Sequence, residues 1–157
     1  MKEHTKEGAV SHIASYPPLL SLSAIIFGLL LDRIVSYRLD FPLAESIGTT
    51  FLVLAPLFIF WAQYSSWRVF KTKKIIEVET QDFHQGPYHF LRHPTYLGLF
   101  CLVFGFAFFA HSLSIVILNV VAFTITHFYV LPHEEKILET KYGEKYINYK
   151  KQVRPWL

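Results

Sequence analysis

Four long apolar stretches, almost free of charged residues, are the feature that most constrains the fold of this chain. A helix needs roughly 20 largely apolar residues to cross the hydrocarbon core of a bilayer, so such stretches predict membrane-spanning helices. The charged residues, 17% of the chain, crowd into the segments between them. This distribution argues against a soluble protein with an ordinary water-facing surface. The four predicted spans are residues 19–36, 47–67, 95–110 and 113–131.

Three details refine these spans. The third is short for a membrane helix, so we expect it to begin partly buried at residues 92–94 or to be tilted. Pro56 inside the second is tolerable because neighbouring helices satisfy the carbonyl that it frees. Only His111 and Ser112 separate the third span from the fourth. If these two spans form a tight hairpin, their other ends are neighbours.

The basic residues predict the orientation of the spans. An even number of spans places both termini and the segment 68–94 on one side of the membrane. All of the 15 lysines and arginines except Arg33 and Arg38 lie on that side. The positive-inside rule therefore predicts that this side is the cytoplasm, with the N- and C-termini both cytoplasmic.

The length of the chain predicts a single unit, residues 1–157, without a linker or a second domain. The lone Cys101 excludes an intrachain disulfide, and its apolar surroundings argue against a zinc or redox motif. The first twelve residues mix both charge signs before a long apolar segment, so we expect no secretory signal. We expect no nucleic-acid partner, and the oligomeric state stays open.

The segment after the fourth span has a helical pattern. Leu138, Tyr142, Tyr146, Tyr149 and Val153 recur at spacings of 4, 4, 3 and 4, which predicts one amphipathic helix flanked by lysines. Such a helix lies on the membrane surface or on the rest of the protein. It is either a plain anchor or part of a substrate site. The expected fold is thus an all-α integral membrane bundle of four transmembrane helices, with a cytoplasmic loop and an amphipathic C-terminal helix.

A polar and aromatic cluster at residues 84–98 marks the start of the third span. Three histidines, an arginine and two tyrosines at a membrane boundary favour a functional role. The alternative is that Arg92 meets lipid phosphates and the tyrosines form an interfacial belt. Pro94 suits a first helical turn and biases His93 away from helical geometry, which predicts a defined corner.

Glu134 and Glu135 follow the fourth span. Adjacent residues on a helix point about 100° apart, so at most one of the two faces a given pocket. In a tight hairpin, one of them approaches His93 and Tyr96. The result is a small pocket with a carboxylate, an imidazole and aromatic faces, which favours a cationic ligand.

A metal site is the competing interpretation of these residues. His89 and His93 have i, i+4 spacing, and His133 with the two glutamates could complete a site. Because Pro94 disrupts the helix that such ligands need, we expect no metal. On the fourth span, Asn119 and Thr126 share a face next to His127, where they either bond between helices or line a substrate cleft.

Together, several segments resemble the isoprenylcysteine carboxyl methyltransferase family, whose C-terminal half is shared by membrane phospholipid methyltransferases. The resemblance covers roughly residues 70–157 and implies an integral membrane enzyme that uses S-adenosyl-L-methionine, bound by a region of about 78–157. The absence of a GxGxxG fingerprint agrees with a cofactor site that is not a Rossmann domain. The segments are residues 86–88, 92–98, 134–135 and 142–146.

The resemblance also implies roles for individual residues. It makes His93 and Glu135 catalytic candidates, with Glu135 holding the methionyl ammonium group. Arg92, Leu131 and Glu134 are its substrate-binding positions. Residues 80–83 would close over the adenosine. The implied cofactor-binding residues are Thr80, Gln81, Asp82, Phe83, Tyr88, His93, Pro94, Thr95, Tyr96 and Glu135.

Two positions depart from the family pattern. Thr80 replaces a common histidine. Leu131 replaces the family's substrate-binding arginine, which argues against recognition of a prenylcysteine carboxylate. The expected function is methyl transfer from S-adenosylmethionine to a lipophilic acceptor in the membrane, either isoprenylcysteine carboxylate-like or phospholipid-like. Rival hypotheses are a non-enzymatic scaffold or transport subunit whose basic tail contacts membrane lipid, and a histidine-box metal oxidase.

Overall fold

The computed structural model describes residues 16–35 and 38–156, and within them the chain is helical, with two isolated β-bridges and no strand. The all-α prediction is confirmed. The expectations for the first twelve residues, and for Ser36 at the end of the first predicted span, lie outside the described residues. The long elements are α2 (Tyr16–Asp32), α3 (Ala44–Thr72), α4 (Pro94–Phe109), α5 (Leu113–Ile125), the π-helical turn η4 (Thr126–Val130), α6 (Leu131–Tyr142) and α7 (Glu144–Gln152).

Each predicted apolar stretch overlaps a helix, although α2 ends at Asp32, before the predicted end of the first span at residue 36. Two helical segments, Ala44–Val69 and Leu113–Tyr142, are long and apolar enough to cross a membrane, whereas α2 and α4 are shorter apolar helices of 17 and 16 residues. The helix α3 passes through Pro56 and extends beyond the predicted 47–67 at both ends. The second of the long segments joins α5, η4 and α6 into one continuous helix.

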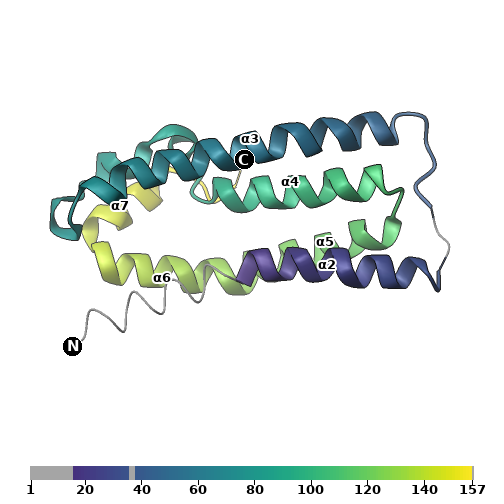
Figure 1. The fold of residues 1–157 in the computed structure, drawn as a ribbon. Coiled ribbons are helices and arrows are strands. Elements are labelled where there is room, and N and C mark those ends of the chain that lie inside the picture. The colour runs from purple at the N-terminus through teal and green to yellow at the C-terminus, as the bar shows by residue number, and fades with distance from the viewer. Residues whose placement is uncertain (1–15, 36–37, 157) are drawn as a thin grey trace.

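The long helices form an elongated bundle (Figure 1). The helix α3 packs along α4, and α2 packs along α5. The α3–α4 contact is close because glycines face each other. A Cβ atom on Gly48 would lie 2.8 Å from the carbonyl oxygen of Gly105, and one on Gly105 would lie 2.7 Å from Cβ of Phe51. Small residues let membrane helices approach in this way.

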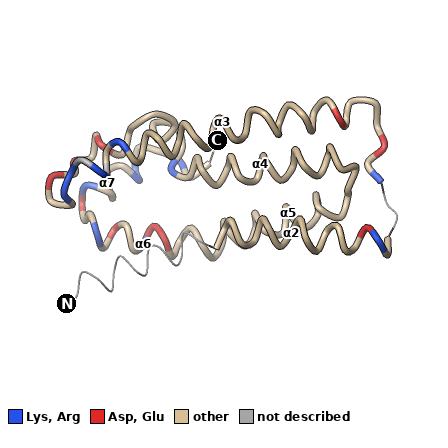
Figure 2. The backbone as a smooth tube through the Cα atoms, in the orientation of Figure 1, with Lys and Arg blue, Asp and Glu red and all other residues tan. Residues whose placement is uncertain are grey.

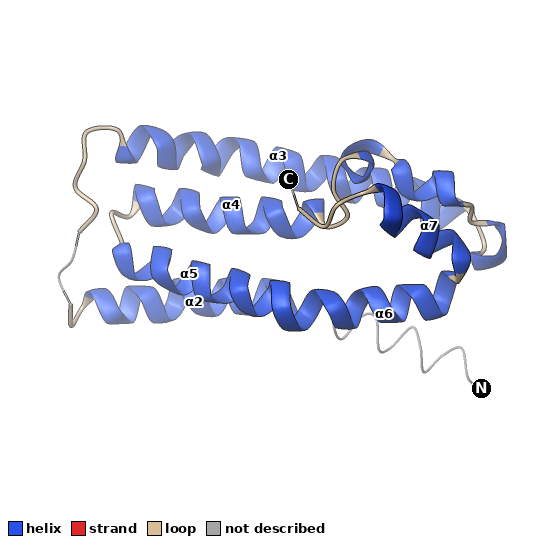
Figure 3. Ribbon diagram, turned by 180° about the vertical axis from the view of Figure 1, so that it is seen from behind, coloured by secondary structure: helices blue, strands red, loops and turns tan. Residues whose placement is uncertain are grey.

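Most of the charged residues lie at one end of the bundle, and a smaller group lies at the opposite end (Figure 2). The more charged end carries α6, α7 and three 3₁₀ turns between α3 and α4. Viewed from behind, α7 folds back against those turns instead of continuing the line of α6 (Figure 3). The 3₁₀ turns are η1 (Ile75–Glu77), η2 (Thr80–His84) and η3 (Gly86–His89).

The prediction of one C-terminal amphipathic helix is wrong, because the helix breaks at Gly143. This residue has φ +60° and ψ −138°, a conformation that only glycine adopts readily. The break lets α7 turn back on the protein. Tyr146 and Tyr149 are thereby buried against Val78 and Phe83. The tyrosine stripe thus packs on the rest of the protein, one of the two placements left open by its sequence.

Candidate functional site

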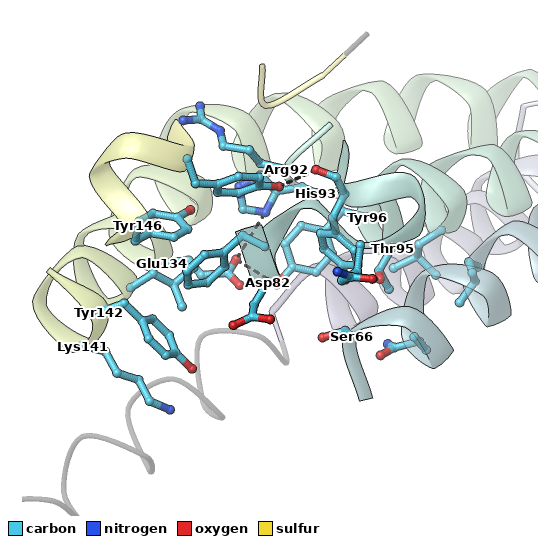
Figure 4. Close-up of a pocket in the computed structure, with 18 of the residues that line it drawn as sticks. Ser66, Asp82, Arg92, His93, Thr95, Tyr96, Glu134, Lys141, Tyr142 and Tyr146 are labelled. Carbon is cyan, nitrogen blue, oxygen red and sulfur yellow. Dashed lines mark hydrogen bonds and ion pairs between the residues drawn. The ribbon is translucent and has the colours of Figure 1, made fainter. Parts of the chain in front are cut away.

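A cavity of about 550 Å³ opens where α4, α6 and the short turns meet, a volume typical of small-molecule sites (Figure 4). Its wall combines polar residues of the 3₁₀ turns with apolar residues of the long helices. Eight of the predicted cofactor-binding and substrate-binding residues line it: Asp82, Phe83, Tyr88, Arg92, His93, Thr95, Tyr96 and Glu134.

The predicted corner at His93 and Pro94 forms one edge of the cavity. His93 precedes α4 with φ −125° and ψ 55°, and Pro94 occupies the first helical turn, where a missing N–H costs nothing. Just upstream, Gly86 turns the chain with φ +54°. A side chain there would collide with Oγ of Ser65, so glycine lets η3 lie against α3.

Glu134 presents a carboxylate to the cavity. The Tyr96 hydroxyl donates a 3.0 Å hydrogen bond to Oε2 of Glu134, and Nδ1 of His93 lies 3.9 Å from the same oxygen. The Tyr96 ring stacks on the His93 imidazole, with centroids 5.6 Å apart and planes within 7°. The predicted meeting of a glutamate with His93 and Tyr96 is confirmed.

Glu135 points the other way, into a buried ionic cluster. Its Oε1 lies 3.0 Å from Nη2 of Arg92 and 3.2 Å from Nε2 of His93, while its Oε2 lies 2.8 Å from Nζ of Lys150. Lys150 also reaches Glu139 at 2.8 Å. With only 6% of its surface exposed, Glu135 joins the corner before α4 to α7. The two adjacent glutamates therefore have separate environments, as expected for neighbours that point about 100° apart on a helix.

Tyrosines from the two C-terminal helices form the opposite wall. Phe83 packs edge-on against Tyr142 and Tyr146 at 5.2 and 5.5 Å between ring centroids and stacks on Tyr149 at 5.3 Å. The Tyr149 hydroxyl donates to the carbonyl of Tyr88 at 2.8 Å. Burial raises the pKa of Tyr88, Tyr146 and Tyr149, so these phenols stay neutral.

Asp82 brings a second carboxylate to the rim. It accepts from Nζ of Lys73 at 2.7 Å and from the backbone N–H of Glu79 at 2.8 Å. Partial burial opposes ionisation of Asp82, but these bonds outweigh it and lower its pKa. The 3₁₀ turn η2 is therefore held in place by an ionised side chain.

Five residues of the predicted site lie off the cavity lining. Thr80 bonds instead to the carbonyl of Lys145 at 3.2 Å, and Gln81 is exposed. Pro94 is buried at the start of α4, and Leu131 packs in a core cluster with Tyr96, Phe100 and Ala122. The fifth is Glu135 in its ionic cluster.

The cavity also contains residues that the sequence analysis missed or left undecided. The apolar stripe of the C-terminal segment had signalled four of them, Leu138 and three tyrosines. Gln63 and Ser66, which lie four and seven residues after Ile59, mark an inward face of α3, and polar residues within an apolar span were the available signal. The additional lining residues are Pro18, Ile59, Gln63, Ser66, Gln85, Leu99, Leu138, Lys141, Tyr142, Tyr146 and Tyr149.

The histidine pair considered for a metal is split by the corner. His89 ends η3, with its ring packed against His84 and Phe90, whereas His93 faces the two glutamates. Among residues 16–35 and 38–156, no three His, Cys, Asp or Glu side chains converge as a metal site would require.

Comparison with known proteins gives one family. A model described as phospholipid methyltransferase matches residues 43–145, which covers well over half of the chain and most of the cavity lining. No curated protein and no solved structure matches the chain.

Proposed function

This chain belongs to the phospholipid methyltransferase family, and on that premise we propose that it transfers a methyl group from S-adenosylmethionine to a lipophilic acceptor in the membrane. The family and the apolar helices together indicate a membrane methyltransferase. The donor, the acceptor and the roles of single residues are our proposals.

The observation that carries the proposal is the Glu134 carboxylate inside a cavity walled by tyrosines. S-adenosylmethionine would supply an electrophilic methyl group on a sulfonium centre, together with an ammonium group. A carboxylate suits the ammonium. Aromatic faces such as those of Tyr96 and Tyr146 attract a cation by about 0.5–2 kcal/mol each. The residues present therefore fit the cofactor.

We assign the ammonium contact to Glu134 and not to Glu135. Glu134 lines the cavity, whereas both oxygens of Glu135 already meet cations or His93. In this proposal Glu135 fixes the His93 imidazole and the corner before α4. Asp82 and Phe83, at the rim on η2, would close over the adenosine.

Catalysis by this site is mainly positioning. The cavity walls align an acceptor with the bond from sulfur to methyl and exclude water, and such alignment contributes about 7–11 kcal/mol in well-oriented reactions. His93 and Glu134 lie where a proton leaving an amine acceptor could be taken up. A carboxylate acceptor would need no such base.

The apolar part of the cavity is suited to the acceptor. Pro18 of α2, Ile59 of α3 and Leu99 of α4 line it. Leu131 is uncharged and buried in the core, and the Arg92 guanidinium is paired with Glu135. This arrangement favours a phospholipid-like acceptor over an isoprenylcysteine carboxylate.

We further propose that the chain is a single domain of four membrane crossings, with the charged end of the bundle in the cytoplasm. The basic residues of the 68–94 segment and of α7 support this orientation. At 1.5 Å per residue the 16-residue α4 reaches only about 24 Å, so the corner at its start lies within the boundary of the bilayer. There the cofactor enters from water and the acceptor from lipid.

Calorimetric titration of S-adenosylmethionine into the detergent-solubilised chain tests the proposal. The wild-type protein should bind, and Glu134→Gln should weaken binding by about tenfold, because it removes a charge-assisted contact. Glu144→Gln, an exposed glutamate at the start of α7, is the matched control and should bind as the wild type does. Absence of binding to the wild-type chain would refute the proposed function and favour a non-enzymatic membrane module.

A further inference from the structure

The segment after α7 folds back to the start of α4. Val153 is buried with 6% of its surface exposed, and Arg154 forms a parallel β-bridge with Leu91. The backbone N–H of Arg92 donates to the carbonyl of Arg154 at 2.9 Å. These contacts fix the position of Trp156 two residues later.

The side chain of Trp156 packs between α4 and the π-helical turn η4. Its Nε1–H donates a 2.7 Å hydrogen bond to Nδ1 of His127, which belongs to that turn. Its ring lies 5.0 Å from the Phe123 ring and packs against the core cluster that contains Tyr96 and Leu131. Because Nδ1 accepts this bond, His127 carries its proton on Nε2. A partly buried indole N–H without such an acceptor would be costly.

The same indole contacts the cavity histidine. The ring centroids of Trp156 and His93 lie 6.1 Å apart, with the planes tilted by 46°. The parallel ring of Tyr96 is also in contact with His93, and Glu135 accepts at Nε2. Three neighbours therefore surround the His93 imidazole. Tyr96 lines the cavity, whereas Trp156 and Glu135 lie outside its lining.

We infer that Trp156 is a positioning residue of the cavity, which holds the His93 imidazole in place through its hydrogen bond to His127. The inference rests on the proposed function, since its purpose is to fix a wall of the cofactor site. It also accounts for the π turn, a rare element that often occurs at functional sites. Here the turn carries the acceptor for the indole N–H.

Two pairs of variants test this inference. Trp156→Phe keeps an aromatic ring but loses the N–H. Trp67→Phe makes the same change on the exposed surface of α3, where Trp67 is 57% exposed. His127→Leu removes the acceptor, whereas His127→Gln retains one in its side-chain oxygen.

The first measurement is imidazole nitrogen NMR of the ¹⁵N-histidine-labelled chain in detergent. We expect Trp156→Phe and His127→Leu to shift the His93 resonances, and Trp67→Phe and His127→Gln to leave them near the wild-type positions. A purely structural role for Trp156 would lower the unfolding temperature without this pattern. Unchanged His93 resonances in both Trp156→Phe and His127→Leu would overturn the inference.

The second measurement is titration of S-adenosylmethionine into the same proteins. Trp156→Phe and His127→Leu should bind about fivefold more weakly than wild type, the scale of one hydrogen bond, and His127→Gln should restore affinity. If the wild-type chain does not bind the cofactor, the proposed function fails. The NMR comparison still decides whether Trp156 positions His93, so the two failures are distinguishable.

Discussion

The Tyr96 hydroxyl donates a 3.0 Å hydrogen bond to Oε2 of Glu134, across 38 positions of sequence. The bond joins the first turn of α4 to the first turn of α6, which the hairpin at Ser112 brings together. It orients the Glu134 carboxylate that lines the cavity. The side-chain geometry of the cavity thus depends on the start of α4 lying beside the continuous helix that contains α6.

Tyr96→Phe should weaken the binding of S-adenosylmethionine about fivefold, because the Glu134 carboxylate loses the donor that orients it. The ring of Tyr96 still packs against His93 and Phe100, so the unfolding temperature should change little. Calorimetry and thermal unfolding in detergent measure the two effects. Tyr64→Phe on the exposed face of α3 is the control. Equal affinity in both variants would contradict the assigned role.

Glu134→Gln and Glu135→Gln should have opposite consequences. Glu135→Gln leaves Arg92 and Lys150 without their carboxylate, and breaking a buried ion pair typically costs about 3–5 kcal/mol of stability. Glu134→Gln should impair cofactor binding while the protein remains nearly as stable as wild type. Thermal unfolding and titration of both variants provide the comparison. A stability loss in Glu134→Gln as large as in Glu135→Gln would show that the division of roles is wrong.

Local signals in the sequence predicted the corner at His93 and the hairpin at His111 and Ser112. Proline and short polar interruptions end or bend a helix in any environment, so these features can be predicted without tertiary information. The inward face of α3 with Gln63 and Ser66 was missed for the opposite reason. Lipid and protein interior are both apolar, so a membrane helix shows little periodicity between its two faces.

The assignment of the two glutamates could not come from the sequence. The direction of their side chains depends on the rotation of α6 about the helix axis relative to α5. The π turn Thr126–Val130 inserts one extra residue between these helices and so changes that rotation. One residue rotates a helix by about 100°, which is the angle that separates Glu134 from Glu135. The break at Gly143 had a local signal, its glycine, but the regular tyrosine stripe masked it.

Gly143→Ala should destabilise the protein by about 1–2 kcal/mol, because a residue with a Cβ atom resists positive φ. Outside residue 143 and its two chain neighbours, no atom lies within 4 Å of where that Cβ would stand, so the cost comes from the local backbone and not from a clash with the rest of the fold. Chemical unfolding in detergent, compared with Gln152→Ala in the last turn of α7, measures it. Stability equal to that of the control would mean that the chain adopts another turn between α6 and α7.

The contacts of His111, at the end of the bundle opposite the cavity, should stabilise the fold in a pH-dependent way. Its Nδ1 lies 3.0 Å from the carbonyl of Leu39 and its Nε2 lies 3.3 Å from Glu45, so both nitrogens face acceptors, with Asp40 nearby at 3.4 Å. The bonds to Leu39 and Glu45 raise the pKa of His111 above its ordinary value of 6.5.

Because the pKa of His111 is raised in the folded protein, its contacts stabilise the fold fully at pH values below 6.5. This stabilisation is lost as the pH rises through the pKa of the folded state. The difference in unfolding temperature between wild type and His111→Asn, which tolerates the positive φ of this position, should therefore be larger at about pH 5.5 than at about pH 9. Because the side chains of Asp40 and Glu45 are exposed, the difference should also shrink in high salt. A difference that is constant with pH would show that His111 acts through its backbone conformation alone.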